Sequence, residues 1–220
     1  MTCRASQRIR ALSLALQCAV LGARVKTIHE LTGVRPGEVL QLLFNEERQP
    51  PRGRTPDARD WLPTASLVER VEASVLASTF DALRNEGFCI TECLLVAYRQ
   101  YRALYGERCH IGFDRAFDLI AHVTGLWTAE RASIALLSCS RCGCRFLDIP
   151  VGRVRASEDC PFCRLLVRYH QDPRIAAFFQ HPSKHAPSKR SAAAAPSRRS
   201  AQKSLLHLPW SAHGSSAGAT

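Results

Sequence analysis

The sequence lacks several features that would place it in a common functional class. It contains no run of about 18 apolar residues, so no membrane-spanning helix is expected. It also has no glycine-rich phosphate-binding loop, no convincing hydrolase triad signature and no His-x-Glu element of a zinc deaminase. These absences argue against three large groups of enzymes, and we expect no enzymatic activity.

Acidic residues are missing from the end of the chain. None follows Asp172, whereas seven basic residues do. The 220 residues carry a formal net charge of +11. The middle is different, because residues 60–138 hold seven basic and ten acidic groups. Such asymmetry fits nucleic-acid contact through the ends and protein contact through the centre, and a surface that only keeps the protein soluble would explain the charge equally well.

Four of the ten cysteines form two Cys-x-x-Cys pairs that are separated by 17 residues. Two residues between cysteines allow a tight turn to aim both sulfurs at one metal ion, and a gap of this length lets the second pair return opposite the first. The spacing therefore predicts one structural Zn²⁺ per chain. The predicted ligands are Cys139, Cys142, Cys160 and Cys163.

Other uses of these cysteines stay open. Disulfides would need an oxidising compartment. Cys160-Pro-Phe-Cys163 alone has the form of a redox dithiol, which would make the protein a thiol-disulfide oxidoreductase. That function requires the dithiol to open a helix within a βαβ unit, and no parallel α/β pattern surrounds it. Within a metal site, Cys144 could exchange with Cys142, and His170 is a further possible ligand.

The N-terminus combines arginines with an apolar run, which imitates a secretory signal. The apolar positions also fall at helical spacings and predict an amphipathic helix over residues 5–24. Because paired Cys-x-x-Cys units fit reduced thiols on a metal better than disulfides, we favour an unprocessed cytoplasmic protein.

Residues 27–47 have the outline of a helix-turn-helix, although many helical hairpins share it. Thr27-Ile-His-Glu30 has the form of a capping box that begins a short helix, and Gly33 ends it. Pro36 begins a second helix that runs to about residue 47. This second helix is expected to bury Val39, Leu40, Leu43 and Phe44.

The next segment, residues 48–56, is rich in proline and arginine and is expected to be neither helix nor central strand. Pro51-Arg-Gly-Arg54 resembles the core of an AT-hook, in which two arginines lie in a narrow minor groove. A basic linker that wraps the protein is the alternative. Asp60-Trp61 restarts ordered structure, with Trp61 as a buried anchor. We take residues 1–60 as an N-terminal DNA-binding region.

Residues 61–138 are predicted to form a helical core and partner-binding region. Three apolar stripes recur at helical spacing, from Leu67 to Leu83, from Leu94 to Leu104 and from Phe113 to Trp127. The third is followed by residues 134–137, which lead into the first cysteine pair. Three further cysteines are interpreted as small buried apolar residues: Cys89, Cys93 and Cys109.

Residues 139–180 are predicted to form a zinc-binding module. Residues 146–150 and Val154 indicate short strands joined near Gly152. Arginines here exceed the number expected to compensate four thiolates on Zn²⁺, which suggests phosphate contact. The candidate DNA-binding residues of the whole chain are Arg35, Arg48, Arg52, Arg54, Arg141, Arg145, Arg153 and Arg155. Residues 181–220 have the composition of a disordered basic tail.

In their order, these features resemble FlhC, the C subunit of the flagellar master transcriptional regulator. The match covers roughly residues 9–170 and its order is more specific than any single motif. The matching stretches are Leu21-Gly-Ala-Arg24, the Pro-Pro-x-Gly of residues 50–53, Asp60-Trp61, Glu72-Ala-Ser-Val with Phe80, Gly87-Phe-Cys, Ala97-Tyr-Arg with Tyr101, and Ser138-Cys-x-x-Cys-Gly143 with Cys160-x-x-Cys163.

The resemblance implies a mainly α protein: a helix-turn-helix-like N-terminal hairpin, a helical middle and a C-terminal four-cysteine zinc module with short strands. It implies the same four zinc ligands that the spacing predicts. It also implies a non-enzymatic transcription activator that works only with FlhD, in a complex of two C and four D subunits. This complex would bind flagellar promoter DNA and recruit RNA polymerase, with no membrane involvement. Cys144 departs from the family pattern, in which a glycine commonly follows the Cys-Gly pair.

Overall fold

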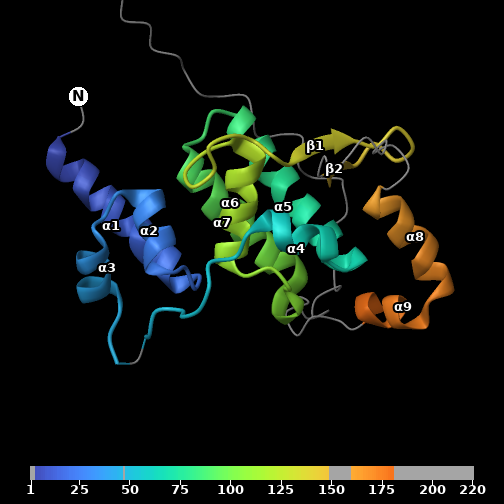
Figure 1. The fold of residues 1–220 in the computed structure, drawn as a ribbon, viewed down its shortest axis with the longest axis horizontal. Helices are drawn as coiled ribbons and strands as arrows, with labels where there is room; N and C mark the ends of the chain where they lie inside the picture. The colour runs from blue at the N-terminus through green and yellow to red at the C-terminus, as the bar shows by residue number, and fades with distance from the viewer. Residues whose placement is uncertain (1–2, 47, 149–159, 181–220) are drawn as a thin grey trace, which may run out of the picture. The chain divides into compact units, whose positions relative to one another are not determined.

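A computed structural model describes residues 3–46, 48–148 and 160–180 of the chain. The predicted tail at 181–220 lies outside these residues. So do Gly152, Arg153, Val154 and Arg155 of the predicted zinc-binding module. The described part is mainly helical, as predicted (Figure 1). Its elements are α1 (Arg4–Val20), α2 (Val25–Thr32), α3 (Pro36–Leu43), α4 (Ala58–Thr64), α5 (Leu67–Asn85), α6 (Ile90–Tyr105), the 3-10 turn η1 (Gly106–Arg108), α7 (Phe113–Thr124), β1 (Ala135–Ser138), β2 (Arg145–Asp148), α8 (Pro161–Gln171) and α9 (Pro173–Gln180).

The first three helices pack on one another, and α1 also contacts α6. α1 ends at Val20, four residues before the predicted end, and Gly22 follows it with a φ of +86°. The face that α1 buries consists of small residues, Ala15, Cys18 and Ala19, while Ile9 and Val20 are 69% and 61% exposed. The apolar spacing therefore predicted the helix correctly but only partly its buried face.

The predicted capping box at Thr27 is wrong. α2 already begins at Val25, so Thr27 lies inside the helix, where it is buried. Its hydroxyl donates to Asp114 Oδ1 of α7 at 2.6 Å. The chain does form a capping box, at the start of α5: the Glu69 N–H donates to Ser66 Oγ at 3.2 Å, and the Ser66 N–H donates to Glu69 Oε2 at 2.9 Å. Both Thr27–Glu30 and Ser66–Glu69 match the Ser/Thr-x-x-Glu pattern of a capping box. Only the second caps a helix, because the Thr27 hydroxyl bonds to Asp114 instead.

The second helix of the predicted helix-turn-helix is shorter than expected. α3 ends at Leu43, and Phe44 has extended backbone angles. Val39 is buried as predicted, and Leu43 and Phe44 pack partly against the core. Leu40 is 45% exposed, contrary to the prediction, because this helix of eight residues contacts α1 and α2 through a single narrow face.

Helix α5 is the central element, in contact with α6, α7, β1, β2 and α8 (Figure 1). The three predicted stripes correspond to α5, α6 and α7, which end beside Gly87, Gly106 and Gly125. Three details differ. Leu104 is 68% exposed, Trp127 lies beyond the end of α7, and Cys89 is exposed because it is the residue that precedes α6. Cys93 is buried and Cys109 partly buried, as predicted.

A fully buried carboxylate ties these helices together. Glu72 of α5 is 0% exposed, and its Oε2 accepts a hydrogen bond from the Tyr101 hydroxyl of α6 at 2.7 Å. Its Oε1 lies 2.8 Å from His110 Nδ1 in the segment before α7. Burial, followed by this bond to Glu72, raises the pKa of Tyr101. The partners surround Glu72 with donors, which a buried carboxylate requires.

Two glycines test how closely the chain packs after α7. Gly33 and Gly125 both follow a helix with a φ of +71°. A Cβ at Gly33 would meet nothing within 4 Å, whereas one at Gly125 would lie 2.7 Å from the Ala132 nitrogen. We expect Gly33→Ala to cost about 1–2 kcal/mol of unfolding free energy through backbone strain. Gly125→Ala should cost about 1–3 kcal/mol more through overlap with the backbone. Urea unfolding of both variants measures the difference, and equal costs would contradict the close approach.

Candidate metal centre

The first cysteine pair lies in the turn of a β-hairpin. β1 and β2 pair antiparallel, with Ala135 opposite Asp148 and Ser138 opposite Arg145. In the turn, the Cys139 N–H donates to the Cys144 carbonyl at 2.9 Å, and the Gly143 N–H donates to the Cys139 carbonyl at 2.9 Å. The predicted strand after the first pair is thus present, but it pairs with β1, which the sequence reading placed in the helical middle.

The hairpin is held against α5 by serines of that helix. The Leu147 N–H donates to Ser74 Oγ at 3.1 Å, and the Ser78 hydroxyl donates to the Arg145 carbonyl at 3.3 Å. Two hydroxyl groups on one face of α5 therefore bond to the backbone of β2, and this positions the turn that carries Cys139 and Cys142.

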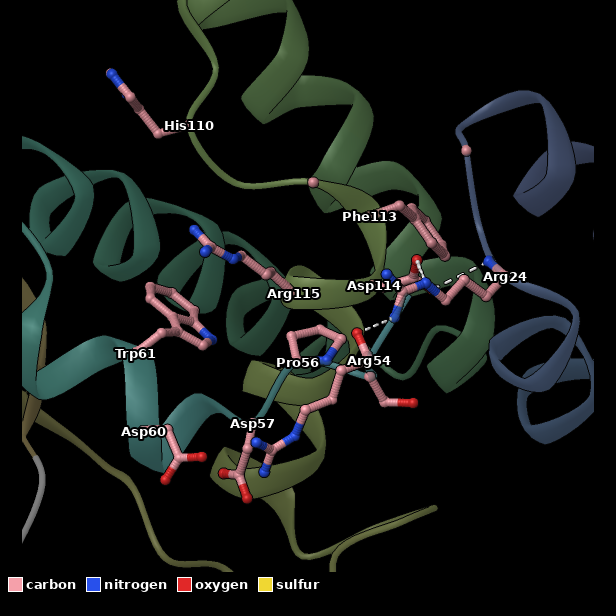
Figure 2. Close-up of a pocket in the computed structure, with 13 residues that line it drawn as sticks. Arg24, Arg54, Pro56, Asp57, Asp60, Trp61, His110, Phe113, Asp114 and Arg115 are labelled. Atoms are coloured by element: carbon pink, nitrogen blue, oxygen red, sulfur yellow. Dashed lines mark hydrogen bonds and ion pairs between the residues drawn. The ribbon is translucent and has the colours of Figure 1, made fainter. Parts of the chain in front are cut away.

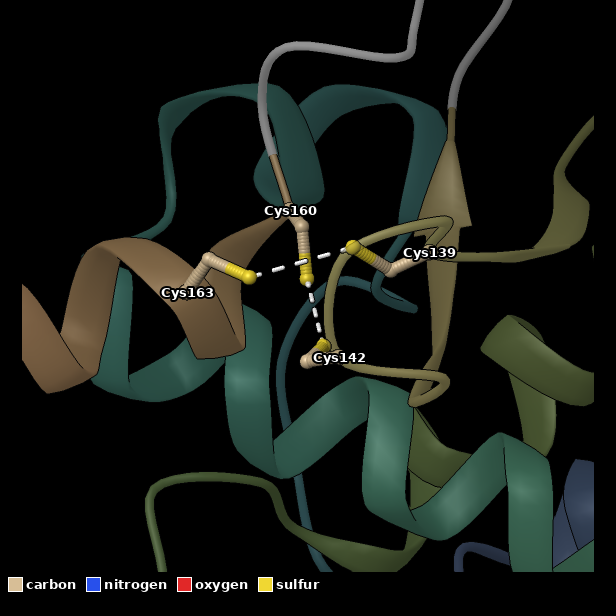
Figure 3. Close-up of side chains that lie close together, drawn as sticks. All are labelled: Cys139, Cys142, Cys160 and Cys163. Atoms are coloured by element: carbon tan, nitrogen blue, oxygen red, sulfur yellow. Dashed lines mark hydrogen bonds between the residues drawn. The ribbon is translucent and has the colours of Figure 1, made fainter.

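The second pair lies at the start of α8. Cys160 precedes the helix, Pro161 occupies its first position, and Cys163 follows in the first turn. Figure 3 shows the four sulfurs converging, two from the hairpin turn and two from the start of α8. Sequence analysis did not predict this helix, although a proline at the first helical position is a recognised start signal.

The sulfur geometry fits a tetrahedral metal ion. Cys139 Sγ lies 3.8 Å from Cys163 Sγ, and Cys142 Sγ lies 3.7 Å from Cys160 Sγ. All four sulfurs lie within 4.8 Å of one another. Four sulfurs placed about 2.3 Å from a central ion would be about 3.8 Å apart. Cys139 and Cys160 are buried, and the side chains of Leu137, Phe146 and Phe162 pack around them.

Backbone donors favour a thiolate at one of the four positions. The N–H groups of Cys142 and Arg141 lower the pKa of Cys139 to about 6. The neighbouring Cys142 thiol, followed by burial, raises the pKa of Cys163 to about 12, and burial raises that of Cys160. Sulfurs this close cannot all ionise without a cation among them. A divalent metal ion would supply that charge, so the residues present fit a metal.

The other predicted ligands lie outside this cluster. Cys144 is exposed, and its backbone carbonyl, rather than its thiol, takes part in the turn. His170 is exposed near the end of α8. The four predicted ligands are therefore the ones that the fold brings together, and an exchange of Cys144 with Cys142 stays a prediction.

The disulfide and redox interpretations are less consistent with the structure. All ten cysteines lie in the described residues and are free thiols. The second pair does open a helix, as a redox dithiol would, but the neighbouring sheet is a two-stranded antiparallel hairpin rather than a βαβ unit. Burial also raises the pKa of Cys160, whereas an attacking thiol needs a lowered one.

The candidate DNA-binding arginines that the structure describes fall in three places. Arg35 is exposed just before α3, and Arg48, Arg52 and Arg54 are exposed on the segment between α3 and α4, called here the arm (residues 48–56). Arg141 is exposed in the hairpin turn. Arg145 is partly buried and forms an ion pair with Asp81 of α5 at 2.6 Å, so its charge is already compensated within the chain.

The arm is held at its backbone by Arg24. The Arg24 guanidinium donates to the carbonyls of Arg52 and Arg54, and it forms an ion pair with Asp114 at 3.4 Å (Figure 2). The backbone N–H of Arg24 donates to the same carboxylate at 3.0 Å. These contacts join residues far apart in the sequence, so no local pattern indicated the role of Arg24 or Asp114.

Two cavities lie where the arm meets α4 and α7. The first, of about 490 Å³, is lined by Arg24, Arg54, Trp61 and Arg115 among others (Figure 2). Trp61 is partly buried there, with the Arg115 guanidinium 5.3 Å from its ring centre. The second, of about 590 Å³, includes four cations in its lining: Lys26, Arg54, Arg59 and Arg131. Sequence analysis did not select Lys26 or Arg131.

Together, the fold and the site define a mainly helical protein with a four-cysteine cluster that fits a metal ion and a backbone-anchored basic arm. No family model matches the chain. It is 30% identical over 180 residues to the flagellar transcriptional regulator FlhC of Serratia marcescens, covering 77% of this chain and 88% of that protein. It is 27% identical over 165 residues to FlhC of Yersinia enterocolitica, covering 72% and 80% of the two chains.

A third relative is FlhC of Xenorhabdus nematophila, 28% identical over 141 residues that cover 63% of this chain and 69% of that one. The chain belongs to the FlhC family of flagellar transcriptional regulators, and the predicted resemblance is confirmed. This is a family of regulators rather than enzymes. Among the described helices, none is long and apolar enough to cross a membrane.

Cys163→Ser should lose the bound metal and destabilise the module, because metal binding and folding are coupled in such sites. Cys144→Ser is the matched control and should keep both. Elemental analysis of the purified protein gives the metal content, and thermal unfolding gives the stability. Full metal content in Cys163→Ser would exclude this ligand set.

The affinity of the cysteine cluster for a metal ion should weaken as the pH decreases. In the metal-free chain, Cys160 and Cys163 have raised pKa values and are protonated at pH 7, so binding releases at least two protons. Protons compete more strongly as pH decreases, and the apparent affinity should weaken at least about 100-fold per unit between pH 8 and pH 6. Below about pH 6, protonation of Cys139 should steepen the loss. Competition with a chelating dye measures it, and a flat profile would contradict the assignment.

Proposed function

We propose that the chain is the DNA-binding subunit of a flagellar transcription activator and works in the bacterial cytoplasm in complex with FlhD. The observation that carries the proposal is its membership of the FlhC family, and the four-cysteine cluster supports it. The complex would contain two copies of this chain and four of FlhD, bind promoter DNA and recruit RNA polymerase.

We infer that the metal is Zn²⁺, with one ion per chain and a structural role. Four sulfurs spaced as the edges of a tetrahedron match a closed zinc site that leaves no position open for a reaction. The ion would join the hairpin turn to α8. This module contacts α5, so the ion would also fix it on the helical middle.

Phosphate contact and base reading are assigned to the arm and to the exposed arginines beside it. Arg24 bonds to backbone carbonyls of Arg52 and Arg54, which leaves both of their side chains exposed. α3 is a weaker candidate for base reading than the helix-turn-helix outline suggested, because it has only eight residues and exposes Leu40 and Leu42. Arg35, exposed just before α3, would add a further positive charge for phosphate contact.

Partner docking is assigned to the helical middle, residues 61–138. Three large apolar side chains on or next to α6 are exposed in this region: Phe88, Val96 and Leu104. Together with the acidic balance of this region, they distinguish it from the basic arm and fit a surface that binds protein rather than DNA.

The test is co-expression with FlhD and a salt-titrated gel shift on a flagellar promoter. The complex should bind, and neither subunit alone should. Arg52→Ala and Arg54→Ala should each weaken binding and lower the slope of log affinity against log salt by about 0.9, because each removes one phosphate contact. Arg84→Ala, an exposed arginine of α5, is the control. Unchanged binding by the arm variants would exclude the arm, and no binding by the complex would exclude the function.

A further inference from the structure

A second group of metal-binding side chains lies away from the cysteines. Asp57 precedes α4, whereas Asp118 and His122 are one turn apart on α7. Their ligand atoms lie within 4.8 Å of one another. Asp118 and His122 are 7% and 8% exposed, and Asp57 is partly buried. A carboxylate and an imidazole this deeply buried are unusual unless their charge and hydrogen bonds are satisfied.

The geometry points to a divalent first-row metal site, selective for imidazole-binding ions such as Zn²⁺, formed by Asp57, Asp118 and His122. His122 Nε2 lies 3.7 Å from Asp57 Oδ1 and 3.9 Å from Asp118 Oδ2. Both distances are too long for a hydrogen bond. Metal bonds of about 2.0–2.2 Å to nitrogen and oxygen would span them after small side-chain shifts.

His122 is already oriented as a metal ligand. Its Nδ1 lies 2.8 Å from Ser133 Oγ, and its backbone carbonyl accepts a hydrogen bond from the Ser133 N–H at 2.8 Å. When Nδ1–H donates to the serine oxygen, the lone pair of Nε2 faces the two carboxylates. Metal-bound histidines usually donate their other ring N–H to a hydrogen-bond acceptor, and Nε2 of His122 has no hydrogen-bond partner among the described residues.

The two carboxylates are also positioned by backbone donors. The Ala58 N–H donates to Asp118 Oδ2 at 2.5 Å, and the Arg59 N–H donates to Asp57 Oδ1 at 2.9 Å. The Arg59 side chain holds the pKa of Asp57 at about 2, so this ligand is ionised at neutral pH. Burial raises the pKa of Asp118, which a bound cation would offset.

The charge around the site decides which ions it can select. It lies in the wall of the 590 Å³ cavity, which gives an ion access from solvent. Four cations line the same cavity, Lys26, Arg54, Arg59 and Arg131, against three acidic residues, Asp57, Asp118 and Glu130. No strong negative field attracts ions here, so Mg²⁺ and Ca²⁺ gain little. Ions that bond strongly to imidazole, such as Zn²⁺, are favoured.

The test is titration of Zn²⁺ into the full chain whose four-cysteine centre is already loaded, followed by calorimetry. The chain should bind one further ion. Asp118→Asn and His122→Gln should each weaken that event at least tenfold, and Ser133→Ala should weaken it about 10- to 100-fold by releasing the histidine. Asp60→Asn, an exposed carboxylate on the adjacent α4, should bind as the wild type does.

Independent readouts keep the two metal centres apart. Cys163→Ser should lose the first ion and keep the second, and Co²⁺ in the second site should show no sulfur-to-metal charge-transfer band because its ligands are nitrogen and oxygen. Circular dichroism checks the fold of each variant, and Ser133→Ala decides the matter should Asp118→Asn not fold. Absence of a further ion at millimolar Zn²⁺, or equal affinity in all four variants, overturns the proposal.

Discussion

Repulsion among four sulfurs is the constraint on which the C-terminal part of the described structure depends. The hairpin and α8 are joined across the undescribed residues 149–159, and their own apolar cluster is small, with Cys139, Phe146 and Cys160 as its buried members. Sulfurs 3.7 to 3.8 Å apart do not attract one another as thiolates. A cation bound among them would turn the same contacts into attractions and stabilise the module. Such an ion would hold the short hairpin turn, with its exposed Arg141, in place relative to α8.

A single carboxylate, Asp114 of α7, holds the N-terminal helices and the arm in place. Asp114 accepts hydrogen bonds from the Arg24 N–H and the Thr27 hydroxyl and forms an ion pair with the Arg24 guanidinium, which in turn bonds to the arm. The first turn of α7, the start of α2 and the arm are therefore set by the same group. The proline-rich arm has few hydrogen bonds of its own, so its path comes from these contacts.

Much of the helical middle was predictable, because α5, α6 and α7 each carry apolar residues at the helical period and end beside a glycine. The clustering of the four cysteines was predictable for a different reason, since two Cys-x-x-Cys pairs at this spacing indicate one shared metal site whatever the surrounding fold. Predictions failed where a residue had two possible partners. Thr27 could cap its own helix or bond to Asp114, and residues 135–138 could continue a helix or pair with β2.

By itself, the sequence determined the helical class, the four cysteines that cluster and the basic character of the arm, because periodicity, spacing and charge are local properties of a chain. Only the tertiary structure decided that Arg24 holds the arm, that β1 completes the hairpin and that Asp57 meets His122. Each of these depends on contacts between residues 7 to 65 positions apart, from Ser138 with Arg145 to Asp57 with His122. Such contacts form only when packing brings the elements together, and no short pattern encodes them.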